Sequence, residues 1–177
     1  MSSIHSNINS PEKPISLLGL LLLNNKLNVI LADDDSDDRE LFEEAITELN
    51  SKIKLSLLED GIQLMNILNK ENPLPDIIFL DMNMPRKSGK KCLEEIRSNP
   101  EYNDLFIIIY STSSNPKDVE EVYKLGANLY LRKPNSYTEL IEILKTIFSL
   151  NLQKYKPKAL KNDFVLNPGR YKLIIHD

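Results

Sequence analysis

Five polar side chains in four separate segments could act together on a phosphate group. Each stands at the end of a short apolar run: Asp33 and Asp34 after the first, Asp81 after the third, Ser111 after the fourth and Lys133 after the fifth. A carboxylate is a competent nucleophile towards phosphorus and gives an aspartyl-phosphate. Clustered carboxylates repel one another, so a hard cation such as Mg2+ suits them, and a lysine would neutralise charge on the transferred group. This combination predicts phosphoryl transfer to an aspartate with Mg2+ as the cofactor.

The segments that must position these residues alternate between short apolar runs and amphipathic stretches. Residues 27–32, 53–57, 77–80, 106–109 and 127–132 are predicted to be strands, and residues 35–50, 61–70, 88–97, 116–125 and 137–150 to be helices. Strand–helix units in succession imply a doubly wound α/β fold, a five-stranded parallel sheet with helices on both faces. Continuously apolar strands belong in the middle of such a sheet. The second and fifth strands are therefore expected at its edges, in the order 2-1-3-4-5.

In an open parallel sheet, ligands bind beyond the carboxyl ends of the strands, where the strand order reverses. That point lies here between the first and third strands, so the carboxylates, the hydroxyl and the ammonium are expected to meet in one crevice. The neighbouring carboxylates of Asp35, Asp37 and Asp38 have a simpler interpretation. They are expected to mark the start of a helix, where negative charge is favourable.

Composition narrows the class of protein. A chain of 177 residues suits one well-filled α/β domain. Residues 27–150 hold 14 Lys and Arg against 23 Asp and Glu, a net charge of −9, which argues against nucleic acid as a partner. The single cysteine, Cys92, excludes an intramolecular disulfide and fits a reducing cytoplasm. The longest apolar run, residues 15–23, is shorter than the roughly 20 residues that a membrane-spanning helix needs.

Over residues 27–150 the sequence resembles the response-regulator receiver family. The matching motifs are Ile30-Leu-Ala-Asp-Asp34, Leu80-Asp-Met-Asn-Met-Pro85 with Gly89, Tyr110-Ser-Thr112, and Gly126-Ala-Asn-Leu-Tyr-Leu-Arg-Lys-Pro134. The run from Asp34 to Glu40 is similar to stand-alone regulators, such as those that serve bacterial phytochrome-type kinases. The resemblance implies a flavodoxin-like fold with the strand order given above.

The resemblance also implies a role for each site residue. Asp81 is implied to be the phosphoacceptor, and Lys133 to pair with the phosphoryl oxygens. Ser111 is implied to supply the hydroxyl that moves to the phosphoryl group, and Tyr130 the aromatic ring that turns inward with it. The implied metal site consists of Asp34, Asp81 and the main-chain carbonyl of Asn83, with Asp33 acting through water.

The function that follows from the resemblance is that of a receiver in a two-component phosphorelay. A sensor histidine kinase or a phosphotransfer protein would donate the phosphoryl group from a phosphohistidine. Because such a domain turns over no free substrate, it is not expected to be an enzyme. It is expected in the cytoplasm, without direct binding to nucleic acid or membrane, and to signal through contacts with other proteins.

Two extensions flank the receiver, residues 1–26 and residues 151–177. The second is too short for a helix-turn-helix output unit. Its apolar runs 164–166 and 171–175 flank Asn167-Pro-Gly169, a pattern that a hairpin would show, but the simpler and favoured interpretation is an arm packed on its own domain or on a second copy. Without an output domain, the signal is expected to leave through helix 116–125, strand 127–132 and helix 137–150. In the family this is the usual dimer face, so a homodimer, or a dimer with the kinase or an effector, is expected there.

Three other classes fit less well. A magnesium-dependent hydrolase with an aspartate nucleophile needs a second acid two residues after it, where this chain has Asn83. A degenerate receiver would lack the acidic pair, the acceptor or the lysine, and all of them are present. A nucleotide- or flavin-binding domain needs glycines after the first strand, where this sequence has consecutive aspartates.

Overall fold

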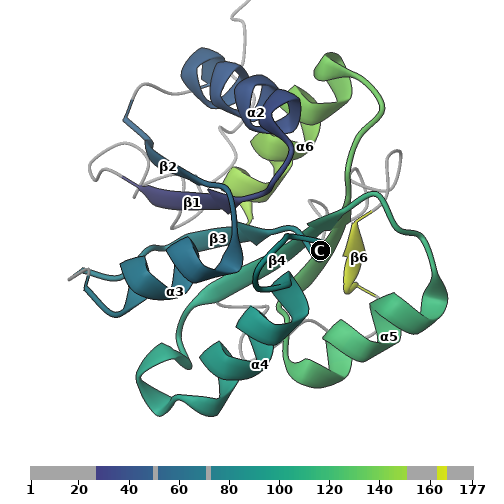
Figure 1. Ribbon diagram of the computed structural model, residues 1–177. Coiled ribbons are helices and arrows are strands. Elements are labelled where there is room, and N and C mark those ends of the chain that lie inside the picture. The colour runs from purple at the N-terminus through teal and green to yellow at the C-terminus, as the bar shows by residue number, and fades with distance from the viewer. Residues whose placement is uncertain (1–26, 50–51, 71–72, 151–162, 167–177) are drawn as a thin grey trace, which may run out of the picture.

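The computed structural model describes residues 27–49, 52–70, 73–150 and 163–166. The strands are β1 (Asn28–Ala32), β2 (Lys54–Leu58), β3 (Ile77–Leu80), β4 (Phe106–Ser111), β5 (Leu129–Arg132) and β6 (Val165–Leu166). The helices are α2 (Ser36–Leu49), α3 (Gly61–Leu68), α4 (Gly89–Ser98), the short 3-10 helix η1 (Pro100–Tyr102), α5 (Pro116–Leu125) and α6 (Tyr137–Ser149) (Figure 1). Each strand and helix predicted from the sequence is present, with small differences at the ends.

The strands form one parallel sheet in the order β2-β1-β3-β4-β5-β6 among the described residues. The order of the first five is as predicted, and β1, β3 and β4 at its centre are almost entirely buried. Strand β2 lies at one edge and is partly exposed, which confirms its predicted place.

Two predictions about the other edge are wrong. The sheet has six strands rather than five, and β5 is not an edge strand, because β6 pairs with its outer side. Tyr130 N–H donates to the Phe164 carbonyl at 2.7 Å, and Leu131 lies opposite Leu166. Unpaired backbone N–H and C=O groups at a sheet edge are costly when buried, and β6 supplies partners for those of β5.

The helices cover both faces of the sheet (Figure 1). Helices α2 and α6 pack side by side on one face, and α3, α4 and α5 follow one another on the other. Local signals set their ends: Ser88 caps α4, Asn115 caps α5 ahead of Pro116, and Gly126 ends α5 in the left-handed conformation. Only glycine adopts that conformation at little cost.

The candidate hairpin is described only in part. Residues 164–166 lie beside β5 and run parallel to it, and residues 171–175 lie outside the described residues, as does the first extension. Within the ranges described above, no helix is long and apolar enough to cross a membrane.

Candidate functional site

The carboxyl ends of β1 and β3 bring two aspartates together. Ala32 and Leu80 are paired neighbours in the sheet, so the residues that follow them, Asp33 and Asp81, leave the sheet side by side. Backbone bonds fix both positions: Asp81 N–H donates to the Ala32 carbonyl at 2.9 Å, and Asp33 N–H donates to the Leu58 carbonyl at 2.9 Å. The site is therefore built on the most deeply buried strands.

Three carboxylates form the predicted cluster. Asp33, Asp34 and Asp81 each offer an oxygen, and these oxygens lie within 4.8 Å of one another. Asp33 and Asp81 are buried, whereas Asp34 is exposed. Asp34 and Asp81 line an open cavity of about 510 Å3, together with Asn83, Thr112, Lys133 and the start of α2. An all-oxygen donor set with open access fits a hard divalent cation.

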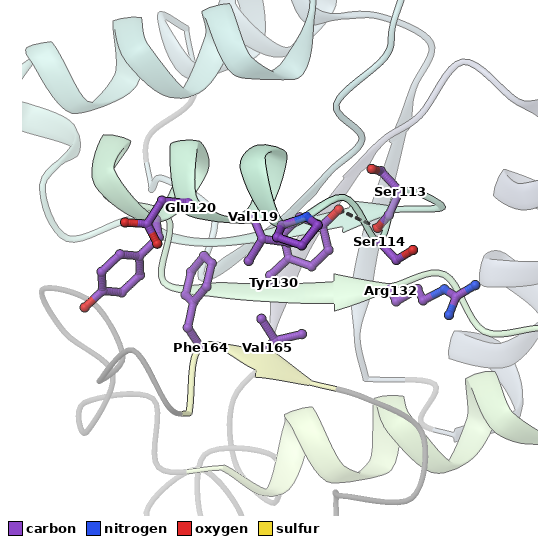
Figure 2. A pocket seen from close by; sticks show the side chains of 10 residues that line it. Ser113, Ser114, Val119, Glu120, Tyr130, Arg132, Phe164 and Val165 are labelled. Carbon is purple, nitrogen blue, oxygen red and sulfur yellow. Dashed lines mark hydrogen bonds between the residues drawn. The ribbon is translucent and has the colours of Figure 1, made fainter.

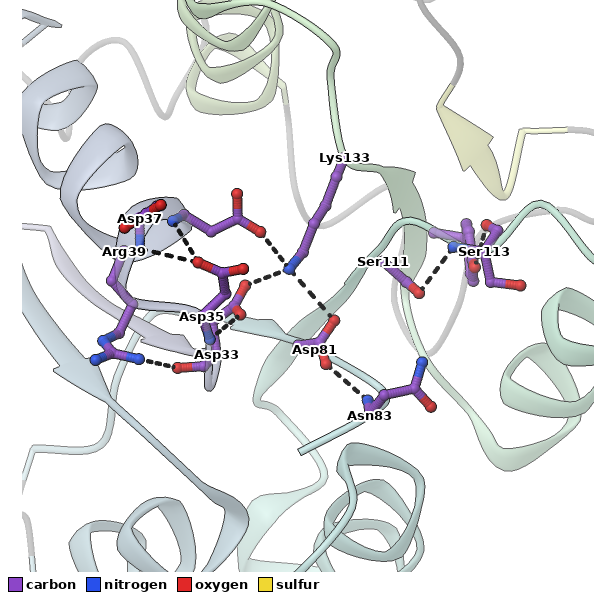
Figure 3. A network of polar contacts seen from close by, with 11 residues as sticks. Asp33, Asp35, Asp37, Arg39, Asp81, Asn83, Ser111, Ser113 and Lys133 are labelled. Atoms are coloured by element: carbon purple, nitrogen blue, oxygen red, sulfur yellow. Dashed lines mark hydrogen bonds and ion pairs between the residues drawn. The ribbon is translucent and has the colours of Figure 1, made fainter. Parts of the chain in front are cut away.

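Lys133 enters the crevice from the end of β5 (Figure 3). Its backbone N–H donates to the Ser111 carbonyl at 2.9 Å, which fixes the start of the side chain. Its ammonium lies 2.7 Å from Asp33 Oδ2, 2.7 Å from Asp38 Oδ2 and 3.5 Å from Asp81 Oδ1. The lysine thus faces the carboxylates from the opposite side of the crevice.

The electrostatics of the crevice favour an additional positive charge. Burial raises the pKa of the Asp33 carboxyl to about 6 and also raises the pKa of Asp81, although Lys133 acts in the opposite direction on both. Burial alone would lower the pKa of Lys133, but its close pairing with Asp33 and Asp38 outweighs the effect of burial and the pKa is raised. One ammonium therefore faces several carboxylates, and a divalent cation would relieve the remaining repulsion.

The loop after Asp81 is closely packed against it. Asn83 N–H donates to Asp81 Oδ2 at 2.7 Å, and Gly89 N–H donates to the Met82 carbonyl at 3.1 Å. A Cβ atom at Gly89 would stand 1.9 Å from the Asp81 carbonyl oxygen. This close approach explains why glycine occupies that position.

Ser111 and Tyr130 lie behind the cavity rather than in its lining. Ser111 is buried, and its hydroxyl accepts a hydrogen bond from Ser113 N–H at 3.2 Å, while the neighbouring Thr112 lines the cavity. The Tyr130 hydroxyl donates to the Ser113 carbonyl at 2.7 Å. Ser113 therefore contacts both residues and connects the crevice to the outer side of β5.

A second cavity, which we call the β6 pocket, lies on that outer side. It has a volume of about 420 Å3 and is lined by α5, β5 and β6, including Val119, Tyr123, Arg132 and Phe164 (Figure 2). The buried Phe164 ring stands 4.9 Å from the Tyr123 ring and 6.4 Å from the Tyr130 ring, measured between centroids. The ring of Tyr130 is itself buried.

Asp35 and Asp38 were predicted to mark the start of a helix. That prediction is right for Asp35 and incomplete for Asp38. Asp35 Oδ1 accepts the N–H groups of Asp37 at 2.9 Å and of Asp38 at 3.3 Å and so organises the start of α2. Asp38 also pairs with Lys133, a contact between residues far apart in sequence. No local sequence signal indicated this contact, because Lys133 stands 95 residues further along the chain.

Comparison with known proteins assigns the class. Residues 29–145 match the response regulator receiver domain family, and the chain belongs to that family. It is 31% identical over 130 residues to response regulator Rcp1 of Synechocystis, a match that covers 71% of this chain and 88% of Rcp1. The resemblance drawn from the motifs is confirmed.

Solved structures agree with this assignment. The phosphorylated cyanobacterial phytochrome response regulator RcpA is similar with a TM-score of 0.65 and 32% identity, over 71% of this chain and 94% of RcpA. The Mn2+-bound form of Rcp1 is similar with a TM-score of 0.64 and 30% identity, over 72% of this chain and 95% of Rcp1. The flavodoxin-like receiver fold is thus confirmed, and the chain is a receiver of the two-component type.

Proposed function

We propose that Asp81 accepts a phosphoryl group from a phosphohistidine of a sensor histidine kinase or a phosphotransfer protein. The observation that carries this proposal is the meeting of Asp33, Asp34 and Asp81 within 4.8 Å, with the Lys133 ammonium facing them. We assign Mg2+ to Asp34, Asp81 and the main-chain carbonyl of Asn83, with Asp33 acting through water. All the ligand atoms are oxygens, as Mg2+ prefers.

The transfer balances without a further reactant. A carboxylate oxygen of Asp81 forms a bond to phosphorus while the bond from phosphorus to the donor nitrogen breaks, and that nitrogen keeps the electron pair. A cation held by Asp34 and Asp81 would neutralise charge on the phosphoryl oxygens. Lys133 pairs with the same oxygens, and the backbone N–H of Asn83, 2.7 Å from Asp81 Oδ2, orients the carboxylate.

The response passes from the crevice to the outer side of β5. In this proposal the Ser111 hydroxyl turns towards the phosphoryl group, which changes its contact with Ser113 N–H. The Tyr130 hydroxyl bonds to the same residue, so its ring is coupled to that movement. Packed elements with two stable arrangements amplify small shifts of this kind.

The surface formed by α5, β5 and α6, with β6 lying on β5, is where we place contact with a second copy, the kinase or an effector. Sedimentation with and without beryllofluoride and Mg2+ tests the homodimer. An increase in mass on activation is expected. A monomer in both states, with amide shifts confined to the crevice, would contradict signalling through this surface.

Incubation of the full chain with acetyl phosphate tests the acceptor. The expected product carries one phosphoryl group, forms only with Mg2+ and is absent in Asp81→Asn. Hydroxylamine should release the phosphoryl group, because an acyl phosphate is labile to it. Asp37→Asn is the matched control, since Asp37 is an exposed aspartate at the start of α2. An acid-stable product, or equal labelling of Asp81→Asn, would refute the proposal.

A further inference from the structure

Asp38 holds Lys133 from outside the carboxylate cluster. The ammonium has three N–H donors, and carboxylates other than Asp81 lie at 2.7 Å from it, namely Asp33 Oδ2 and Asp38 Oδ2. Asp81 Oδ1 is farther away, at 3.5 Å. The lysine is therefore bound more closely by these two residues than by the proposed acceptor.

Asp38 differs from Asp33 in what it can bind. Asp33 belongs to the three-carboxylate cluster, whereas Asp38 does not. The Asp38 side chain is 33% exposed and lines the same cavity from the first turn of α2. Its carboxylate therefore contacts the Lys133 ammonium from outside the group of residues that would hold a cation.

Acidic residues at the start of a helix usually accept its free N–H groups or interact with its positive end, and α2 has other residues that do both. Asp35 already accepts two N–H groups there, and Asp37 supplies a carboxylate in the same turn. What distinguishes Asp38 from Asp37 is the contact with the ammonium. The pair also links α2 to the end of β5.

We propose that Asp38 is a positioning residue that holds the Lys133 ammonium while Asp81 is unmodified and yields it to the phosphoryl group. This inference rests on the proposed function. A phosphoryl group on Asp81 brings strong acceptor oxygens and a negative charge. Phosphoamino acids in general carry a charge of about −1.5 to −2 at neutral pH. The phosphoryl group is a stronger partner for the ammonium than one carboxylate, so Asp38 competes with the product.

Replacing Asp38 by its neutral isostere tests this competition. In Asp38→Asn, the rate constant for labelling by acetyl phosphate with saturating Mg2+ is expected to rise by about 3- to 10-fold. This is less than a fully buried charge-assisted hydrogen bond would give, because the Asp38 side chain is 33% exposed. Asp37→Asn removes the same charge from the same helical turn without a contact to Lys133. It is expected to stay within about twofold of the wild type, as an exposed and screened charge.

A second measurement needs neither metal nor donor. The 15N-detected ammonium signal of Lys133, observed in EDTA, is expected to shift and its protons to exchange faster in Asp38→Asn, and to stay unchanged in Asp37→Asn. A purely structural role of Asp38 at the helix start would change neither the signal nor the labelling rate in this specific way.

The outcomes separate the two ideas. If the wild type is not labelled at Asp81, the proposed function fails. If the wild type is labelled but the two variants behave alike, or Asp38→Asn is labelled more slowly, then Asp38 does not compete with the product and this inference is wrong while the proposed function stands. Faster labelling together with the altered ammonium signal would support it.

Discussion

The crevice and the β6 pocket lie on either side of Ser113 and are stabilised in opposite ways. In the crevice, buried Asp33 and Asp81 are held together by Lys133, and burial disfavours their charged forms. In the β6 pocket, Phe164 packs against Tyr123 and Tyr130 without any buried charge among them. Burying unbalanced charge costs stability, whereas burying apolar area supplies it.

This difference separates function from stability within one small domain. Changes in the crevice are expected to alter phosphoryl transfer and the response to metal more than the fold. Changes at Phe164 are expected to alter the fold more than phosphoryl transfer. The following variants test that division.

The largest effect on stability is expected for Phe164→Ala. The ring is 1% exposed, and truncating a buried phenylalanine costs about 3–5 kcal/mol, less where the site can collapse. Urea denaturation measures the loss, and labelling of Asp81 by acetyl phosphate is expected to persist below the transition. Val165→Ala, at a half-buried neighbour, is the control and should cost less. Equal losses in the two variants would mean that the aromatic contacts do not hold β6 on β5.

A smaller effect that depends on metal is expected for Lys133→Ala. The variant leaves the buried Asp33 without its counter-charge. Breaking a fully buried pair from one side costs about 3 kcal/mol or more, and a smaller loss is expected here because Lys133 lines a cavity that is open to solvent. Mg2+ in the cluster would replace part of that charge, so the loss should be greatest in EDTA and reduced by Mg2+. The labelled variant should also give no spectral change on activation. The same loss of stability with and without Mg2+ would contradict this account of the crevice.

The smallest effect is a dependence of stability on pH. Burial raises the pKa of Asp33 to about 6 in the folded chain, above its value of 3.8 in the absence of such surroundings. A raised carboxyl pKa means that the folded state binds the proton more tightly than the unfolded state, so this group destabilises the fold when ionised and the cost disappears as the pH falls through 6.

In EDTA, the free energy of unfolding is therefore expected to gain on the order of 1–2 kcal/mol from this group between pH 7 and pH 5. Urea titrations at the two pH values measure it, and Asp33→Asn should lose the dependence. If the wild type and Asp33→Asn lose the same free energy of unfolding between pH 7 and pH 5, other carboxylates determine the dependence of stability on pH.

The sequence alone determined the first five strands, the helices between them and the edge at which the cluster forms. The spacing of hydrophobic residues distinguishes strands from helices. Because the carboxyl ends of parallel strands lie at the same edge of the sheet, Asp33 and Asp81 had to be neighbours once β1 and β3 paired. The roles of Ser111, Tyr130 and Asn83 came from motifs and stay predictions.

The tertiary structure decided what depends on contacts between distant segments. The sequence singled out the apolar run 164–166, but only the pairing of residues 165–166 with Tyr130 and Leu131 placed it in the main sheet as β6 and moved β5 from the edge to the interior. The partner of Asp38 was equally hidden, because its place in the first turn of α2 does not show which side chain lies opposite. The local sequence pattern indicates which face of a helix or strand is buried. Only the tertiary structure determines which side chains from other elements pack against that face.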